Sequence, residues 1–223
     1  MIGSPRVHYR VTDSTNERAR TLAAAGAPHG TLVTADEQRA GRGRQGRAWT
    51  APPRSAVLMS VVLRELSETL PLAAAVAVCE ALPVEASIKW PNDVWIDGRK
   101  VAGILLEGRP QEGWAVLGIG LNVATEEFPA DLSATSLRLE GSTVAPGEAL
   151  AAVLSALRLW LPRPAADVLA AWRSRDALVG APIRWSNGGK EGIAAGVDDS
   201  GALIVETVDG RVTLDAGEVH LER

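Results

Sequence analysis

The stretch AGRGRQGRAWTAPP, residues 40–53, concentrates arginines between glycines. Its arginines, with the one that directly precedes it, are Arg39, Arg42, Arg44 and Arg47. Guanidinium groups bind phosphate and carboxylate oxygens in pairs, and glycine allows the backbone to approach a ligand closely. The chain as a whole is acidic, with a formal net charge of −4, so this positive charge needs a local explanation. We interpret the stretch as a mobile clamp for a small polyanion, with Trp49 as a flat surface for an aromatic or apolar ligand.

Three other interpretations of the stretch compete with the clamp. Residues 41–46 match the letters G-x-G-x-x-G of dinucleotide-binding loops, but that fingerprint requires a helix to begin there, and Pro52 and Pro53 argue against one. A disordered RGG-like segment that binds nucleic acid is a second alternative, although one copy in an acidic chain is a weak signal. The third is a solvated loop without a role, but such charge usually spreads over helices.

A second group of polar and charged residues occurs in the motifs KWPNDVW and GRKVAG, which supply Lys89, Asn92, Asp93 and Lys100. A lysine two residues after a hairpin glycine usually faces solvent. Ala102 and Gly103 follow Lys100, however, and such small residues allow a ligand to approach a strand closely. Lys100 is therefore a candidate binding residue.

Neither a nucleophilic triad nor a metal-ligating cluster is visible. The three histidines, His8, His29 and His220, are scattered and lie outside every motif, so we expect ordinary surface or core residues. Cys79 is the single cysteine, which excludes an internal disulfide, and its apolar neighbours predict a buried thiol. We expect the same buried environment for Trp95, Trp114, Trp160, Trp172 and Trp185.

The bulk composition predicts a soluble protein with a sizeable core. The chain has 223 residues, of which 46% are hydrophobic. The N-terminus lacks a secretory signal, and the apolar run at residues 72–82 is too short to cross a bilayer. Since the chain is acidic, general nucleic-acid binding is disfavoured. We expect a cytoplasmic protein that does not act at a membrane.

Helix and strand signals alternate over most of the chain. A helix is expected over residues 13–26, with Ser14 and Glu17 at capping-box spacing and Gly26 at the stop position. Further helices are expected at residues 71–82, 147–161 and 164–178, and strands at residues 30–36, 55–63, 86–108 and 113–123. The strand region at 86–108 breaks at Pro91 and turns back at Asp97-Gly98, a strong hairpin signal.

After Gly180 the chain shows short β-like runs separated by Gly, Asn and Asp turns, which predict a small all-β module, a barrel. The fold class is therefore α+β, with a mixed β-sheet flanked by helices followed by this module. We place the first domain at residues 1–177 and the second at residues 178–223.

The strings GRGRQGRAW, KWPNDVW, GRKVAGILLE and GIGLNV occur here in one order, preceded by DSTN. In this combination the sequence resembles the biotin protein ligases over nearly its whole length. Lipoate ligases share that fold but not these strings. The resemblance implies a catalytic domain of the biotin/lipoate ligase type and a C-terminal SH3-like β-barrel. The DNA-binding domain of the repressor members is expected to be absent, because DSTN begins at Asp13.

The resemblance implies an activity in two steps. Biotin and ATP, with Mg²⁺ carried by the nucleotide, form biotinyl-5′-adenylate, and biotin then passes to one lysine of the biotin carboxyl carrier domain of an acyl-CoA carboxylase. No DNA partner is expected, and the chain is expected to be a monomer or a weak homodimer. The transfer step needs a base for the acceptor lysine. Asp93 is the candidate, and a role at the Pro91 turn or in orienting Lys89 is the alternative.

The resemblance also assigns the site residues. Biotin-binding residues would be Ser14, Thr15, Asn16, Gln38, Arg42, Gly43, Arg44, Lys100 and Gly103. Nucleotide-binding residues would be Arg42, Arg44, Trp49, Lys89, Asn92, Gly118, Gly120 and Asn122. The catalytic set would be Lys100, Arg42, Arg44, Lys89 and Asp93. The four cations would bring a carboxylate and a triphosphate together against their repulsion. Gly118 and Gly120 either permit tight packing or open a strand to the adenylate. Without ligand, the loop from Arg39 to Trp49 is expected to be disordered or displaced.

Overall fold

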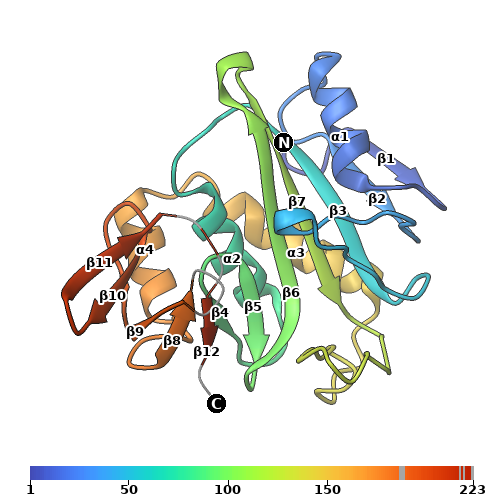
Figure 1. The fold of residues 1–223 in the computed structure, drawn as a ribbon. Coiled ribbons are helices and arrows are strands. Elements are labelled where there is room, and N and C mark those ends of the chain that lie inside the picture. Colours follow the sequence, from blue (N-terminus) through green and yellow to red (C-terminus); the bar gives the residue numbers. More distant parts are fainter. Residues whose placement is uncertain (186–188, 216, 218, 222–223) are drawn as a thin grey trace.

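The computed structural model describes residues 1–185, 189–215, 217 and 219–221. Its larger sheet has seven strands in the order β1-β2-β3-β7-β6-β5-β4 (Figure 1). These strands are β1 (Arg6–Tyr9), β2 (Leu32–Ala35), β3 (Ala56–Leu63), β4 (Ser87–Lys89), β5 (Asp93–Ile96), β6 (Arg99–Arg109) and β7 (Trp114–Asn122). The sheet is mixed, because β1 pairs with β2 in parallel and the other neighbours pair antiparallel.

In the described residues, four α-helices and two short 3₁₀ turns accompany this sheet. They are α1 (Thr15–Ala24), α2 (Leu70–Ala81), α3 (Pro146–Trp160), α4 (Ala165–Arg173), η1 (Arg44–Gly46) and η2 (Pro110–Glu112). The expected stop and start signals hold: the Ser14 hydroxyl accepts a hydrogen bond from the Glu17 N–H, and Gly26 has φ +88°. Asp97 and Gly98 both have positive φ, at 48° and 73°, as a tight hairpin between β5 and β6 requires.

The two faces of the seven-stranded sheet have different coverings. Along β3 every residue is buried, as its apolar run predicts. Val57, Met59 and Val61 join the main core with α2 and α3, whereas Val62 packs with α1. Because side chains alternate along a strand, Ser60 and, on β7, the glycines share the face of α1. This second face is covered by α1 at one end only, and the remainder borders the site described below (Figure 1).

The C-terminal residues form an antiparallel sheet of five strands in the order β11-β10-β9-β8-β12. The strands are β8 (Pro182–Trp185), β9 (Lys190–Val197), β10 (Leu203–Thr207), β11 (Gly210–Leu214) and β12 (Val219–Leu221). The expected small all-β module is therefore confirmed, as is the α+β class of the whole. The boundary at residues 177/178 stays a prediction.

The two sheets share one continuous core. Ile183, Leu203 and Val205 of the C-terminal strands belong to the same buried cluster as α2 and the main sheet. Trp90 donates a hydrogen bond from Nε1 to the Gly201 carbonyl at 3.1 Å, which joins the KWPND turn to the C-terminal sheet. None of the helices in the described part of the chain has the length and apolarity that a bilayer crossing requires.

Candidate active site

A cavity of about 440 Å³ lies on the partly covered face of the large sheet, beneath the arginine-glycine loop. It brings together every candidate residue that the sequence indicated: Ser14, Thr15, Asn16, Gln38, Arg42, Gly43, Arg44, Trp49, Lys89, Asn92, Asp93, Lys100, Gly103, Gly118, Gly120 and Asn122. These residues come from the start of α1, the segment between β2 and the loop, the loop itself, the turn between β4 and β5, and the four adjacent strands β4 to β7. The chain thus converges on one cavity from segments that are far apart in sequence.

Glycines form the floor of this cavity. Gly103 of β6 and Gly120 of β7 are register partners. A Cβ added to Gly120 would overlap the indole of Trp49, and one added to Gly103 would lie 3.1 Å from Trp49 Cζ3. A Cβ on Gly118 would overlap the side chain of Asn16. Both β7 glycines therefore permit close packing of other side chains, the first of the two explanations offered for them.

Lys100 is held at one wall of the cavity by its neighbours. Its ammonium lies 2.6 Å from Asp93 Oδ1 and 5.6 Å from the centre of the Trp49 ring. The backbone of Lys100 also pairs with residues 133–135, since its N–H donates to the Ser133 carbonyl and its carbonyl accepts from Thr135 N–H, both at 2.9 Å. Asp93 thus contacts Lys100, and it is also the register partner of Lys89, so the alternative in which it orients Lys89 stays open.

A buried hydrogen-bond chain lies at the other wall. Gln38 Oε1 accepts from the N–H of Thr15 at 2.7 Å and from its hydroxyl at 3.0 Å. Ser60 Oγ lies 2.8 Å from Thr15 Oγ1 and 2.5 Å from Asn16 Oδ1. Asn16 Nδ2 in turn donates to Glu107 at 2.9 Å. This wall offers both donors and acceptors to a polar ligand group.

The arginine-glycine loop is folded over the sheet. It closes on itself through Gly43 N–H to the Arg47 carbonyl at 2.7 Å and Trp49 N–H to the Gly41 carbonyl at 2.9 Å. Arg44 donates to Asn92 Oδ1 at 3.4 Å. The conformation described here is this closed one, so displacement of the empty loop stays a prediction. No α-helix follows the loop before Leu70, which removes the support for a dinucleotide fingerprint.

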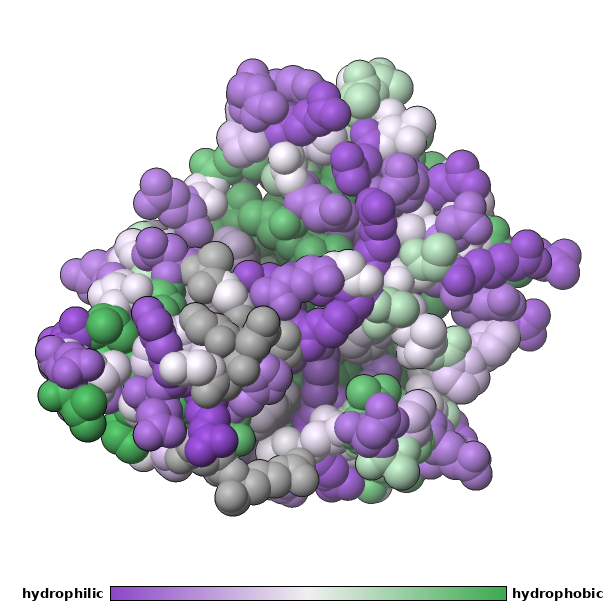
Figure 2. Space-filling model, in the orientation of Figure 1, coloured by the Kyte–Doolittle hydropathy of each residue, from purple (hydrophilic) through white to green (hydrophobic). Residues whose placement is uncertain are grey.

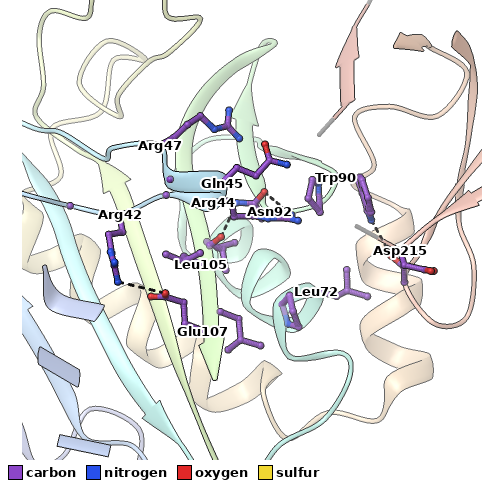
Figure 3. Close-up of a pocket in the computed structure, with 18 of the residues that line it drawn as sticks. Arg42, Arg44, Gln45, Arg47, Leu72, Trp90, Asn92, Leu105, Glu107 and Asp215 are labelled. Atoms are coloured by element: carbon purple, nitrogen blue, oxygen red, sulfur yellow. Dashed lines mark hydrogen bonds and ion pairs between the residues drawn. The ribbon is translucent and has the colours of Figure 1, made fainter. Parts of the chain in front are cut away.

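A second cavity of about 980 Å³ lies on the other side of the same loop. Figure 3 shows its lining, with Arg42 directed toward Glu107 and Arg44 toward Asn92, while Leu72 and Asp215 lie across the opening. Figure 2 shows the opening as a hollow with a hydrophobic floor and a hydrophilic rim. Since residues 42–44 line both cavities, a molecule longer than one cavity would pass beneath the loop.

Comparison with known proteins agrees with this arrangement. Residues 8–123 match the family described as "Biotin/lipoate A/B protein ligase family", and residues 183–221 match "Biotin protein ligase C terminal domain". The chain is 36% identical to the biotin--[acetyl-CoA-carboxylase] ligase of Mycobacterium tuberculosis, covering 94% of this chain and 86% of that protein. It is 35% identical to the bifunctional ligase/repressor BirA of Bacillus subtilis, covering 99% of this chain and 75% of that one.

The chain belongs to the biotin protein ligase family. Among solved structures, the Aquifex aeolicus biotin protein ligase in complex with biotin and ATP has a TM-score of 0.85 and 28% identity, with 99% of each chain covered. The fold expected from the sequence strings is therefore confirmed.

Part of the lining of this ligase-family cavity was missed from sequence. Phe128, Leu132 and Ser133 line it from a segment after β7 that carries no recognisable motif. Its only sequence signal is the absence of helix and strand periodicity next to the GIGLNV strand. Trp95 was expected in the core, yet it is half-buried, lines this cavity and lies 5.2 Å beneath the ammonium of Lys89. His220 is exposed on β12, as a surface residue should be, but it also reaches the cavity rim.

The remaining titratable candidates lie away from this cavity. His8 contacts Thr34 and Asp36 on the β1–β2 edge, and His29 accepts from the Arg64 N–H. Burial raises the pKa of the Cys79 thiol to about 12, as expected for a buried cysteine. Among the described residues, no group of three or more His, Cys, Asp or Glu side chains is placed to hold a metal ion.

Proposed function

We propose that this member of the biotin protein ligase family activates biotin with ATP as biotinyl-5′-adenylate and transfers biotin to a lysine of a carrier protein. The observation that carries the proposal is the convergence of Lys100, the arginine loop and Trp49 on one cavity. The names of the relatives, which include biotin--[acetyl-CoA-carboxylase] ligase, support the biotin carboxyl carrier domain of an acyl-CoA carboxylase as the acceptor.

The smaller cavity has the chemistry that biotin requires. Its volume of about 440 Å³ lies within the range of about 300–1,000 Å³ for small-molecule sites. Phe128 and Leu132 provide apolar surface for the ring and the alkyl chain. Because both Thr15 donors bind Gln38 Oε1, the Gln38 amide nitrogen as donor and the Thr15 hydroxyl oxygen as acceptor would serve a polar ring substituent. Lys100, at the opposite wall, suits the carboxylate end.

The first step unites two anions. A biotin carboxylate oxygen attacks the α-phosphorus of ATP, a new O–P bond forms, and the bond to the β-phosphate oxygen breaks to release pyrophosphate. Two unit charges 4 Å apart repel by about 4 kcal/mol at an effective dielectric constant of about 20. Arg42, Arg44 and Lys100 line the cavity where these charges would meet and offset this repulsion.

Mg²⁺ would enter with the nucleotide and share the phosphate charge. The described residues fit this arrangement. The lining is rich in cations, its Asp93 is already paired with Lys100, and the described residues contain no group of three His, Cys, Asp or Glu side chains placed to hold a metal ion. Phosphate oxygens would therefore be the main ligands of the metal ion.

In the second step the acceptor lysine attacks the acyl carbon and AMP leaves. A free ammonium with a pKa of about 10.4 must first lose a proton, because it has no lone pair. Asp93 is the candidate base. Its Oδ1 already accepts from Lys100 at 2.6 Å, so its second role is to hold Lys100 in place. The two roles differ in which step they affect, and a variant separates them below.

The decisive experiment measures pyrophosphate release with biotin and ATP, and mass addition to a biotin carboxyl carrier domain. We expect both to depend on biotin, and lipoate not to replace it. Lys100→Ala should lower adenylate formation by at least about 100-fold, because the carboxylate loses its counter-charge. Lys190→Ala is the matched control, since Lys190 is exposed on β9 and outside both cavities. Full activity of Lys100→Ala, or no biotin-dependent pyrophosphate release by the unaltered chain, would refute the proposal.

A further inference from the structure

Glu107 has no assigned role, yet it lies between the two cavities and contacts groups on both sides. It is on β6, where Gly103, Leu105 and Glu107 face the same side because side chains alternate. Its Oε2 accepts from Asn16 Nδ2 at 2.9 Å, and its Oε1 lies 3.5 Å from Arg20 and 3.9 Å from Arg42. One carboxylate thus joins the cavity wall, helix α1 and the arginine loop. Figure 3 shows its contact with Arg42.

The contact with Asn16 sets the direction of the hydrogen-bond chain. An ionised carboxylate only accepts, so the Asn16 amide must present Nδ2 to Glu107 and Oδ1 to Ser60. Ser60 has one hydroxyl proton, which is then committed to Asn16. The Thr15 hydroxyl donates to Gln38 Oε1. The pattern of donors and acceptors at this wall therefore depends on Glu107.

Burial makes this dependence strong. Asn16 is 4% exposed, and its amide packs so closely against Gly118 that a Cβ at that position would overlap it. An amide in such a position cannot turn to water when its partner changes. Hydrogen bonds to a charged group are also stronger than neutral ones.

The contact with Arg42 connects the same carboxylate to the loop. Arg42 lies 3.1 Å from Glu17 and 3.9 Å from Glu107, so two carboxylates from different elements attract it. The arginine is half-exposed, and each contact alone is weak. Together they favour the closed position of a loop whose glycines give it little packing.

We propose that Glu107 is a positioning residue for biotin activation, which orients the Asn16 amide at the cavity wall and holds Arg42 in the closed loop. The inference rests on the proposed ligase function. Glu107 touches no reacting atom and acts through these two side chains.

Glu107→Gln tests the proposal, because glutamine keeps the size but removes the charge and adds a donor. We expect the KM for biotin in pyrophosphate release to rise about tenfold, the effect of losing one charge-assisted hydrogen bond, with a smaller change in kcat. In a double-mutant cycle with Arg42→Gln, the two effects should not add, since one side chain acts through the other. An unchanged KM, or strictly additive effects, would overturn the proposal.

A second measurement reports on the loop without activity. Trypsin cuts after arginine, and Arg42, Arg44 and Arg47 lie in the loop. We expect cleavage there, followed by mass spectrometry, to be several-fold faster in Glu107→Gln than in the unaltered chain, and to stay faster in Glu107→Asp, whose shorter side chain withdraws from both partners. Equal cleavage rates would overturn the proposed hold on the loop.

Glu112→Gln is the matched control. Glu112 precedes β7 on the same hairpin, pairs with the exposed Arg109 at 2.8 Å and lines neither cavity. It should leave the KM for biotin and the loop cleavage unchanged. If the unaltered chain shows no biotin-dependent pyrophosphate release, the ligase function itself fails. If it does but Glu107→Gln behaves like Glu112→Gln, only the role of Glu107 fails.

Discussion

At the scale of single residues, the absence of a side chain at Gly120 is as important as the cations. The indole of Trp49 lies where a β-carbon on Gly120 would be, so the closed loop depends on this glycine. Gly120 has no positive φ, and its replacement is therefore a matter of space rather than of backbone strain.

Gly120→Ala should accordingly displace Trp49 and weaken ligand binding. Overpacking costs about 1–3 kcal/mol, which corresponds to a loss of affinity of about tenfold or more. Titration calorimetry with biotin, with and without a nonhydrolysable ATP analogue, measures the change. Gly147→Ala is the control, because nothing lies within 4 Å of that position on α3. Equal affinities for the two variants would show that biotin binding does not depend on the packing of Trp49 against β7.

Asp93 poses a different question at this scale, namely which step it serves. Because Asp93 Oδ1 lies 2.6 Å from Lys100, we expect Asp93→Asn to release Lys100 and to slow adenylate formation by about tenfold or more. Single-turnover pyrophosphate release measures this step, and transfer from preformed biotinyl-adenylate measures the other. Slower transfer with normal adenylate formation would identify Asp93 as a base alone, and no change in either step would remove it from the mechanism.

At the scale of elements, the sequence predicted helix ends and turns, because these depend on interactions within a few residues. Ser14 and Gly26 bound α1, and Asp97-Gly98 turns the β5–β6 hairpin, because capping and positive φ act within a few residues. Strand β1 and the wall at residues 128–134 were not predicted. Both depend on partners distant in sequence, β2 for the first and the backbone of Lys100 for the second.

The candidate site was more predictable than these elements, but for another reason. Apart from Trp49, its candidate residues are charged, hydroxyl-bearing or amide-bearing residues and glycines in short motifs, and the family resemblance united those motifs. Contacts between motifs could not be predicted from the sequence. Glu107 is the last residue of the motif GRKVAGILLE, but its contacts with Asn16 and Arg42 exist only in the folded chain. Trp95 was placed in the core because an indole in a strand usually is.

The segment at residues 175–177 covers the open edge of β4 and carries a pH dependence. Ile88 N–H donates to the Arg175 carbonyl at 2.7 Å, and Ala177 N–H donates to the Ile88 carbonyl at 2.9 Å. Between them, burial raises the pKa of the Asp176 carboxyl above its ordinary value, and its Oδ2 is buried without a hydrogen-bond partner. The folded chain therefore retains a proton that the unfolded chain loses earlier as the pH rises.

Because the folded state binds more protons between the ordinary and the raised pKa, stability should fall as the pH rises through that interval. Above this pH interval, the buried ionised carboxylate lowers the free energy of unfolding by a constant amount. Asp176→Asn should remove this slope. The free energy of unfolding of the variant, relative to that of the unaltered chain, should therefore be higher at neutral pH than at acid pH. Urea unfolding from pH 4 to pH 8 measures this, with the exposed Asp209→Asn as control. A parallel pH dependence of Asp176→Asn and the unaltered chain would contradict the assignment.

At the scale of the whole molecule, the two sheets behave as one packed body. Buried side chains from both belong to one cluster, and Arg173 Nε and Nη2 donate to the Val197 carbonyl at 3.1 and 3.0 Å. The larger cavity is lined by both parts, through residues 104–107 of β6 and through Ser200–Ala202 and Asp215, which lie outside the strands of the C-terminal sheet. The shape of that cavity therefore depends on how the two sheets are joined, and the Trp90–Gly201 hydrogen bond lies at that junction.

This continuity predicts how the molecule unfolds. The chain should unfold in a single transition, with circular dichroism and tryptophan fluorescence giving the same midpoint, because separating the sheets would expose shared core. Trp90→Phe keeps the ring in its buried position but removes the donor to Gly201. It should lower the Tm by about 2–4 °C, the effect of about 1 kcal/mol in a chain of this length, without dividing the transition. Trp160→Phe, which loses a bond to the surface residue Glu80, should change it less. Two separate transitions in the unaltered chain would mean that the C-terminal sheet is an independent unit, and the larger cavity would then change shape as that unit moved.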